Sequence, residues 1–239
     1  MINTPPPFNN NTYQGYSPTD IATASSAIRR VYLKMTLALL VTAFTALGCY
    51  NSPAFWSFMQ ANSWATWGLF IVELILVFAI SGAIQKMSTA TGTLLFYIFA
   101  LVNGIALTPI FIVYTHTSID KTFFITAATF GAMSVYGYFT VKDLTRWGSI
   151  LIMSLFGLII AAVVNMFLRS SGLDWIISIV GVLIFVGLTA WDTQRIKQLA
   201  QVTPANQVGR LATIGALNLY LDFINLFLYL LRFFGSSRD

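Results

Sequence analysis

Residues 211–234, LATIGALNLYLDFINLFLYLLRFF, form an apolar run long enough to cross a bilayer as a helix, and Asp222 lies near its middle. Crossing about 30 Å of hydrocarbon takes about 20 helical residues. An ionised carboxylate at the centre of such a helix costs roughly 2.5 to 3.5 kcal/mol on insertion scales. Asp192 directly follows a second apolar run, residues 174–191. Both aspartates are therefore candidate functional residues of a membrane protein.

The composition of the whole chain supports this class. Hydrophobic residues make up 57% of the sequence and charged residues only 9%, against about 25% charged residues in ordinary soluble domains. Five more apolar runs are long enough to span the bilayer, at residues 31–50, 67–85, 93–114, 122–140 and 148–168. A transmembrane β-barrel is excluded because its strands alternate apolar and polar residues, whereas these runs are continuously apolar. The expected fold is an all-α integral membrane protein with seven transmembrane helices.

Two regions are expected along the chain. Residues 1–28 hold three consecutive prolines and an asparagine run, with too little apolar surface to offset the entropy of ordering, so they are predicted to form a flexible cytoplasmic tail. They are not a cleavable signal, because no apolar stretch starts before Val31. Residues 29–239 are predicted to form the seven-helix transmembrane domain. Within the third run, Gly104 and Pro109 permit close packing or a kink.

Basic residues indicate how the chain is oriented in the bilayer. With seven crossings, nine of the 13 lysines and arginines fall on the side of the N-terminus and four on the other. The positive-inside rule then predicts a cytoplasmic N-terminus and an exoplasmic, or periplasmic, C-terminus. The net charge of +5 is explained by this topology, so the expected partner is the lipid bilayer and not a nucleic acid.

The last apolar run carries a stripe of polar residues. Successive intervals of 4, 3, 4 and 3 place five of them on one face of a helix. They are Asn218, Asp222, Asn225, Tyr229 and Arg232. Such a face cannot be exposed to lipid, so this helix is expected to be enclosed by the others or to line a water-filled path.

Asp192 ends the sixth run and Asp222 lies about ten residues into the seventh, so the two share the cytoplasmic half of the bilayer if either helix tilts or starts late. Two neighbouring carboxyl groups cannot both ionise at low cost, so they would share one proton and act as a pH-operated latch. The alternative is that Asp192 is an interfacial residue compensated by Arg195, one helical turn further on.

Glu73 is the other acidic residue inside an expected span, near the exoplasmic end of the second run. The base expected at comparable depth is Arg232, so the two are predicted to pair, since a buried carboxylate is tolerable beside a guanidinium. This pair either belongs to a transport path or is a structural salt bridge that locks two helices.

Cofactor and metal motifs are not found in the sequence. It has no glycine-rich phosphate loop, one cysteine, Cys49, and one histidine, His116, so no pair of these residues has metal-ligand spacing. We therefore expect no cofactor and no resident metal. A transient Ca²⁺ ion near Asp192 and Asp222 is the one cation contact that we predict.

Four segments resemble the Bax inhibitor-1 family, also called transmembrane Bax inhibitor motif proteins, over about residues 25–235. They are GLTAWDTQRIK (187–197), LNLYLDFINLF (217–227), LRFFG (231–235) and FGAMSVYGY (130–138). The chain is most similar to the bacterial inner-membrane branch. The resemblance implies seven helices with the last one central.

The same resemblance implies roles for particular residues. Asp192 and Asp222 match the family's paired-aspartate pH sensor, which is associated with a calcium leak, and Glu73 and Arg232 match a charged pair between the second and seventh helices. Some members have a base low on the second helix that engages the sixth-helix aspartate. Here the nearest base is Lys86, expected at the membrane interface.

The sequence is compatible with three functions. The first is a pH-sensitive leak of cations, above all Ca²⁺. The second is a non-transporting regulator of a membrane protease or a stress response, with residues 1–28 as the interaction element. The third, an intramembrane aspartyl protease, is disfavoured because Leu219, Tyr220 and Leu221 precede Asp222 where those enzymes resemble Gly-x-Gly, and no Pro-Ala-Leu segment follows. We therefore expect that the protein is not an enzyme.

Overall fold

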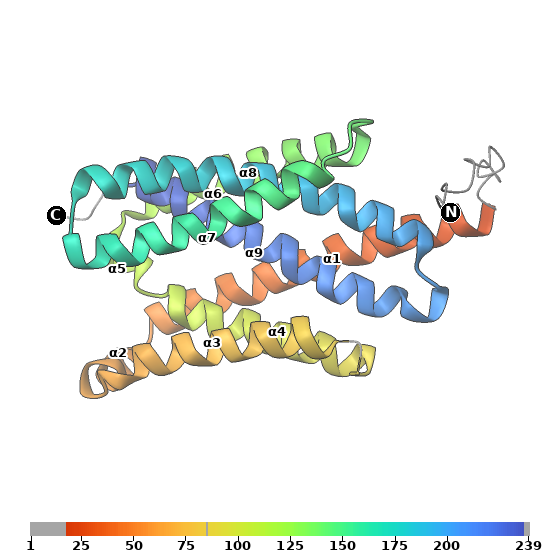
Figure 1. The fold of residues 1–239 in the computed structure, drawn as a ribbon. Helices are drawn as coiled ribbons and strands as arrows, with labels where there is room; N and C mark the ends of the chain where they lie inside the picture. The colour runs from red at the N-terminus through yellow and green to blue at the C-terminus, as the bar shows by residue number, and fades with distance from the viewer. Residues whose placement is uncertain (1–17, 85, 237–239) are drawn as a thin grey trace, which may run out of the picture.

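The computed structural model describes residues 18–84 and 86–236, with side chains from residue 24 onward. Its long helices lie side by side in a bundle (Figure 1). They are α1 (Pro18–Tyr50), α3 (Trp64–Ala83), α4 (Thr89–Leu107), α6 (His116–Phe139), α7 (Thr145–Leu168), α8 (Ser171–Val202) and α9 (Val208–Phe234). Between them come short helices, namely α2 (Pro53–Ala61), α5 (Ile110–Val113) and the 3₁₀ helix η2 (Ala205–Gln207).

Six segments of this bundle are long and apolar enough to cross a membrane: residues 24–50, 64–83, 89–113, 145–168, 171–202 and 205–234. They coincide, to within two residues at their ends or by extending beyond them, with six of the seven expected spans. The remaining span, residues 122–140, coincides closely with α6, which is helical as expected but is not among the six because threonine, serine, glycine and tyrosine interrupt its apolar residues. The fold is thus all-helical over the described residues, and the seventh crossing stays a prediction.

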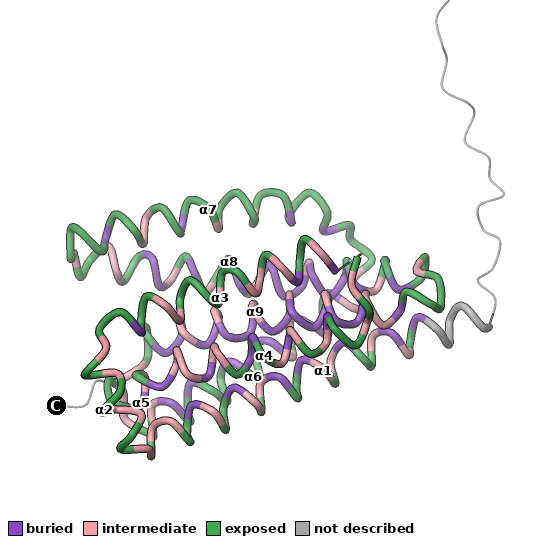
Figure 2. The backbone as a smooth tube through the Cα atoms, turned by 90° about the horizontal axis from the view of Figure 1, so that it is seen from below, coloured by how far each residue is buried: buried purple, intermediate pink, exposed green. Residues whose placement is uncertain are grey.

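Helix α9 lies at the centre of the bundle. It packs against α1, α4, α6 and α8, and its residues are buried along most of its length, as the purple tube in Figure 2 shows. Leu217, Leu219, Tyr220 and Leu226 are fully buried. Helix α7, by contrast, is mostly exposed and packs chiefly on α8. The last helix is therefore enclosed by the others, as its polar stripe indicated. Within the stripe Asp222 is buried, Asn218, Asn225 and Tyr229 are half-buried, and Arg232 is exposed.

The first helix starts earlier than predicted. Residues 18–28, assigned from the sequence to a flexible tail, belong to α1, and that assignment is wrong for them. Ala24 and Ala27 are buried in a small apolar cluster with Ala200 at the end of α8 and with Val208 and Leu211 at the start of α9. Contacts with distant parts of the chain therefore order this segment. Residues 1–17 of the predicted tail lie outside the described residues.

Helix α8 continues beyond the predicted end of the sixth run. Ile196 and Ala200 are buried one and two turns after Asp192, so the inward-facing side of the helix persists to its last turn. The helix stops at Val202, shortly before Pro204. Asp192 consequently lies inside a continuous helix and not at its end.

The break expected in the third run is present. Helix α4 ends at Leu107, and Pro109 precedes the short helix α5. Gly104 lies so close to α1 that a Cβ there would be 2.6 Å from the carbonyl oxygen of Thr42. The proline breaks the span and the glycine lets α1 and α4 approach each other.

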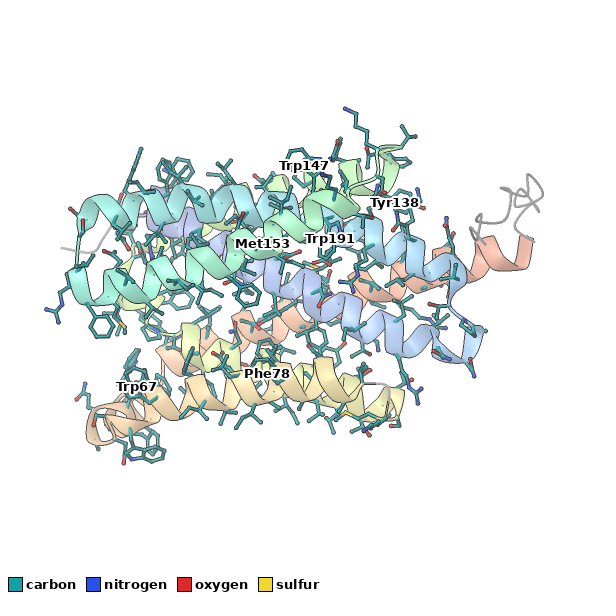
Figure 3. All side chains as sticks on the ribbon, in the orientation of Figure 1. Trp67, Phe78, Tyr138, Trp147, Met153 and Trp191 are labelled. Atoms are coloured by element: carbon teal, nitrogen blue, oxygen red, sulfur yellow. The ribbon has the colours of Figure 1, made fainter. Side chains whose placement is uncertain are left out.

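Large apolar side chains cover the outside of the bundle. Trp67 and Phe78 on α3, and Trp147 and Met153 on α7, are all exposed and are labelled in Figure 3. An apolar surface of this extent would not be stable in water. It is suited to contact with lipid.

Candidate functional site: a buried aspartate pair

Helices α8 and α9 bring Asp192 and Asp222 together. The two residues are only 6% and 4% exposed, and their carboxyl groups are within interaction distance of each other. The side chain of Asn218, one turn before Asp222, also contacts Asp192. The approach that the sequence left open is therefore present in the structure.

Each aspartate keeps one oxygen without a partner. Among the described residues, neither Oδ1 of Asp192 nor Oδ2 of Asp222 has a hydrogen-bond partner, and both atoms are buried. Two ionised carboxylates in this position would repel each other and lack compensating donors. The arrangement is chemically suited to holding one proton between the two groups, or to binding a cation in its place.

A cavity of about 390 Å³ opens beside the pair. Helices α7, α8 and α9 form it, and α7 supplies apolar side chains such as Ile152 and Leu155. Its polar lining consists of Asp192, Arg195, Asn218, Asp222, Asn225 and Tyr229. Four of the five residues in the predicted polar stripe thus face one cavity.

Arg195 is the base beside Asp192. It interacts electrostatically with that carboxyl group, and its guanidinium lies over the ring of Trp191 with 5.1 Å between the guanidinium carbon and the ring centroid. Trp191, labelled in Figure 3, packs directly against Gly148 of α7. Lys86, the second-helix base considered from the sequence, is exposed in the turn between α3 and α4.

The predicted pair of Glu73 and Arg232 is not formed, and this expectation is corrected. Arg232 Nη1 donates a hydrogen bond to Oδ1 of Asp174 at 3.1 Å, with both side chains 45% exposed. The sequence places Asp174 at the edge of the sixth span, whereas α8 begins at Ser171 and holds Asp174 in its first turn.

Glu73 belongs instead to a hydrogen-bonded network that the sequence analysis missed. Asn103 Nδ2 donates to Glu73 Oε1 at 2.8 Å, and the Tyr220 hydroxyl donates to Asn103 Oδ1 at 3.0 Å. The Tyr220 hydroxyl also lies 2.6 Å from the hydroxyl of Thr42. The network links α3, α4, α9 and α1. Its available signal was the polar residues inside apolar runs, here Thr42 and Asn103.

Lys34 also makes polar contacts that the sequence did not predict. It lies inside α1, and its Nζ donates hydrogen bonds of 2.7 Å to the hydroxyls of Thr93 on α4 and Thr213 on α9. A lysine four residues into the expected span 31–50 was the signal for a polar contact at this point.

No group of three or more histidine, cysteine, aspartate or glutamate side chains in residues 24–84 and 86–236 is placed to hold a metal ion. The site of interest is therefore the carboxyl pair and its cavity.

Comparison with known proteins shows the family to which the chain belongs. The sequence model of the family described as "inhibitor of apoptosis-promoting Bax1" matches residues 24–239. The chain belongs to the Bax inhibitor-1 family. The family resemblance predicted from the four segments is confirmed, and the match includes both aspartates and all the helices that surround them.

Bacterial relatives match most of the chain. It is 46% identical to the inner membrane protein YbhL of Escherichia coli K12 over 212 residues, which cover 87% of this chain and 91% of that one. A protein of Borreliella burgdorferi is 45% identical over 222 residues, covering 92% and 96% of the two chains. A membrane protein of Streptococcus pyogenes serotype M3 is 41% identical over 171 residues, covering 72% and 74%.

Proposed function

We propose that this Bax inhibitor-1 family protein is a pH-sensitive cation leak channel, most suited to Ca²⁺, in which the Asp192 and Asp222 pair is the gate. The observation that carries this proposal is a pair of buried carboxyl groups, each with an unpartnered oxygen, that line a cavity between helices. The name of the Escherichia coli relative supports a location in the bacterial inner membrane.

The chemistry of the cavity favours a cation. Carboxylate and amide oxygens are hard ligands of the kind that Ca²⁺ binds, and Asp192, Asp222, Asn218 and Asn225 supply them here. A proton held between the carboxyl groups and a cation bound to them compete for the same oxygens. Protonation therefore biases the arrangement of α8 against α9, as a two-state switch requires.

Our proposal includes seven crossings, with α6 as a spanning helix. Thr122, Thr126 and Ser134, which lower its hydropathy, are buried against the rest of the bundle and so need not face lipid. An odd number of crossings puts the two termini on opposite sides, and the positive-inside rule puts the N-terminus on the cytoplasmic side.

The proposal is tested by Ca²⁺ flux into liposomes carrying the purified protein, from about pH 6 to about pH 8, where an ordinary aspartate with a pKa of about 3.9 stays ionised. Wild-type protein should conduct above empty liposomes with a rate that depends on pH. Asp222→Asn should remove that dependence. Asp174→Asn, an aspartate outside the cavity, should retain it.

Absence of flux above empty liposomes would reject the channel and favour the regulator, whose effect on a membrane protease should then depend on residues 1–17. In our proposal the carboxyl pair exchanges a proton and a cation and cleaves no peptide bond. Cleavage of a membrane peptide that stops in Asp222→Asn would contradict it in favour of the aspartyl protease.

A further inference from the structure

Lys34 holds a positive charge at a junction of three helices. Its ammonium group, on α1, donates to Thr93 on α4 and to Thr213 on α9, and the two threonine hydroxyls are 3.1 Å apart. Both hydroxyls donate hydrogen bonds to helix carbonyls, Thr93 to that of Thr89 at 2.7 Å and Thr213 to that of Gly209 at 3.0 Å. The threonines therefore accept from Lys34 without neutralising its charge.

Further bases surround this junction. Arg30, one turn before Lys34, is close enough to interact with it electrostatically. Arg210 Nε donates to the carbonyl of Met87 at 3.1 Å, in the turn that also contains Lys86. We call Arg30, Lys34, Lys86 and Arg210 the basic cluster. Within the described part of the chain, the one salt bridge joins Arg232 and Asp174 and involves none of these four.

The cluster lies where α1 meets the start of α4 and the start of α9, at the end of the bundle that contains the α3–α4 turn (Figure 1). Exposed leucines adjoin its residues in the sequence: Leu33, before Lys34, is 57% exposed, and Leu94, after Thr93, is 61% exposed. A ligand here would meet positive charge and, next to it, an apolar surface. That combination matches a phospholipid headgroup and its acyl chains.

We propose that the basic cluster binds the phosphate of an anionic phospholipid. Guanidinium and ammonium groups donate charge-assisted hydrogen bonds to phosphate oxygens, and basic pockets between transmembrane helices bind anionic headgroups. Lys34 has three N–H donors, of which the two threonines take two, so one remains for a phosphate oxygen. The flanking leucines favour a lipid over a soluble phosphate. This site is independent of the aspartate pair and of the proposed function.

The test is thermal unfolding of the purified protein in detergent, with added phosphatidylglycerol, phosphatidylcholine or inorganic phosphate. We expect phosphatidylglycerol alone to raise the midpoint. Arg30→Gln and Arg210→Gln should each weaken the lipid affinity about fivefold, the effect of one basic residue near a headgroup. Lys121→Gln removes the same charge from an exposed site on α6 and should behave as wild type.

Arg30 is exposed, so its substitution leaves the helix contacts intact even if the Arg210 variant unfolds. Equal shifts with phosphatidylglycerol and phosphatidylcholine would overturn the proposal, as would equal shifts for Arg30→Gln and Lys121→Gln. A shift produced as strongly by inorganic phosphate would assign the cluster to a soluble anion and contradict the lipid.

Discussion

Asp192 and Asp222 are so close that the charge of each affects the other. Both side chains are buried and in contact, so removing one carboxyl group changes the state of the other. The unpartnered oxygens make the doubly ionised pair costly, and a shared proton or a bound cation relieves that cost. The nearby Arg195 offers a third way to balance the charge, and it is fixed in place by Trp191.

Arg195→Gln is expected to raise Ca²⁺ flux about two- to fivefold, because an exposed charge beside a carboxylate contributes up to about 1 kcal/mol. The guanidinium no longer competes with the entering cation for Asp192. Initial rates in liposomes at fixed pH measure the effect. Arg195→Lys keeps the charge and should stay near the wild-type rate. If both variants behaved alike, Arg195 would have no electrostatic role in the path.

Tyr220→Phe is expected to destabilise the protein by about 1 kcal/mol, the typical value of an interhelical hydrogen bond in a membrane protein. The change removes the hydroxyl that contacts Asn103 and Thr42. Denaturant unfolding in detergent measures the loss. Tyr229→Phe, on the same helix, retains ring stacking on Phe185 and should cost less. Equal losses would show that the network does not stabilise the bundle.

At the scale of helices, close contact between α6 and α8 helps to place the aspartate pair. Gly137 on α6 lies directly against the backbone of Ala190, two residues before Asp192, and a Cβ there would collide with it. Because both contacting groups are backbone, neither can rotate away. The position of Asp192 therefore depends on a glycine in a neighbouring helix.

Gly137→Ala is expected to lower stability by about 1 to 3 kcal/mol, the usual cost of overpacking, and to alter flux by displacing α8. Gly131→Ala on the same helix is the matched control, since a Cβ there meets no other atom within 4 Å. Thermal unfolding and flux are measured on both. A Gly137 variant as stable and active as the Gly131 variant would contradict this packing.

The helices themselves were largely predictable from the sequence, and their partners were not. Apolar length located six spans, and the polar stripe correctly indicated that α9 is enclosed. The helical start of α1 and the extension of α8 depend on contacts between Ala24, Ala27 and Ala200, which hydropathy does not register. The pairing of Arg232 with Glu73 rested only on their similar depth in the bilayer. Depth does not show which side of a helix a residue lies on, and Arg232 contacts Asp174 instead.

At the scale of the whole molecule, the bundle is built around one polar helix. Its surroundings hide Asp222 and Tyr220 from lipid, while α7 is attached mainly to α8 and covers the cavity from one side. The starts of α1 and α9 lie at the same end of the bundle, so the basic cluster is on the side of the membrane where α1 begins.

Seven crossings predict that the two termini lie on opposite sides of the membrane. A fluorescent protein fused to the N-terminus should fluoresce in the cytoplasm, and alkaline phosphatase fused after residue 239 should be active outside it. The reverse pair of fusions is the control. Both termini on the same side would contradict seven crossings.

In our proposal, one proton shared by Asp192 and Asp222 sets the rate of cation flux. The most direct measurement is the pH dependence of Ca²⁺ flux in wild type, Asp192→Asn, Asp222→Asn and the double variant, as a double-mutant cycle. A shared proton predicts that each single substitution removes the dependence as completely as both together. Independent, additive effects of the two substitutions, or a pH dependence that survives in the double variant, would contradict a shared proton.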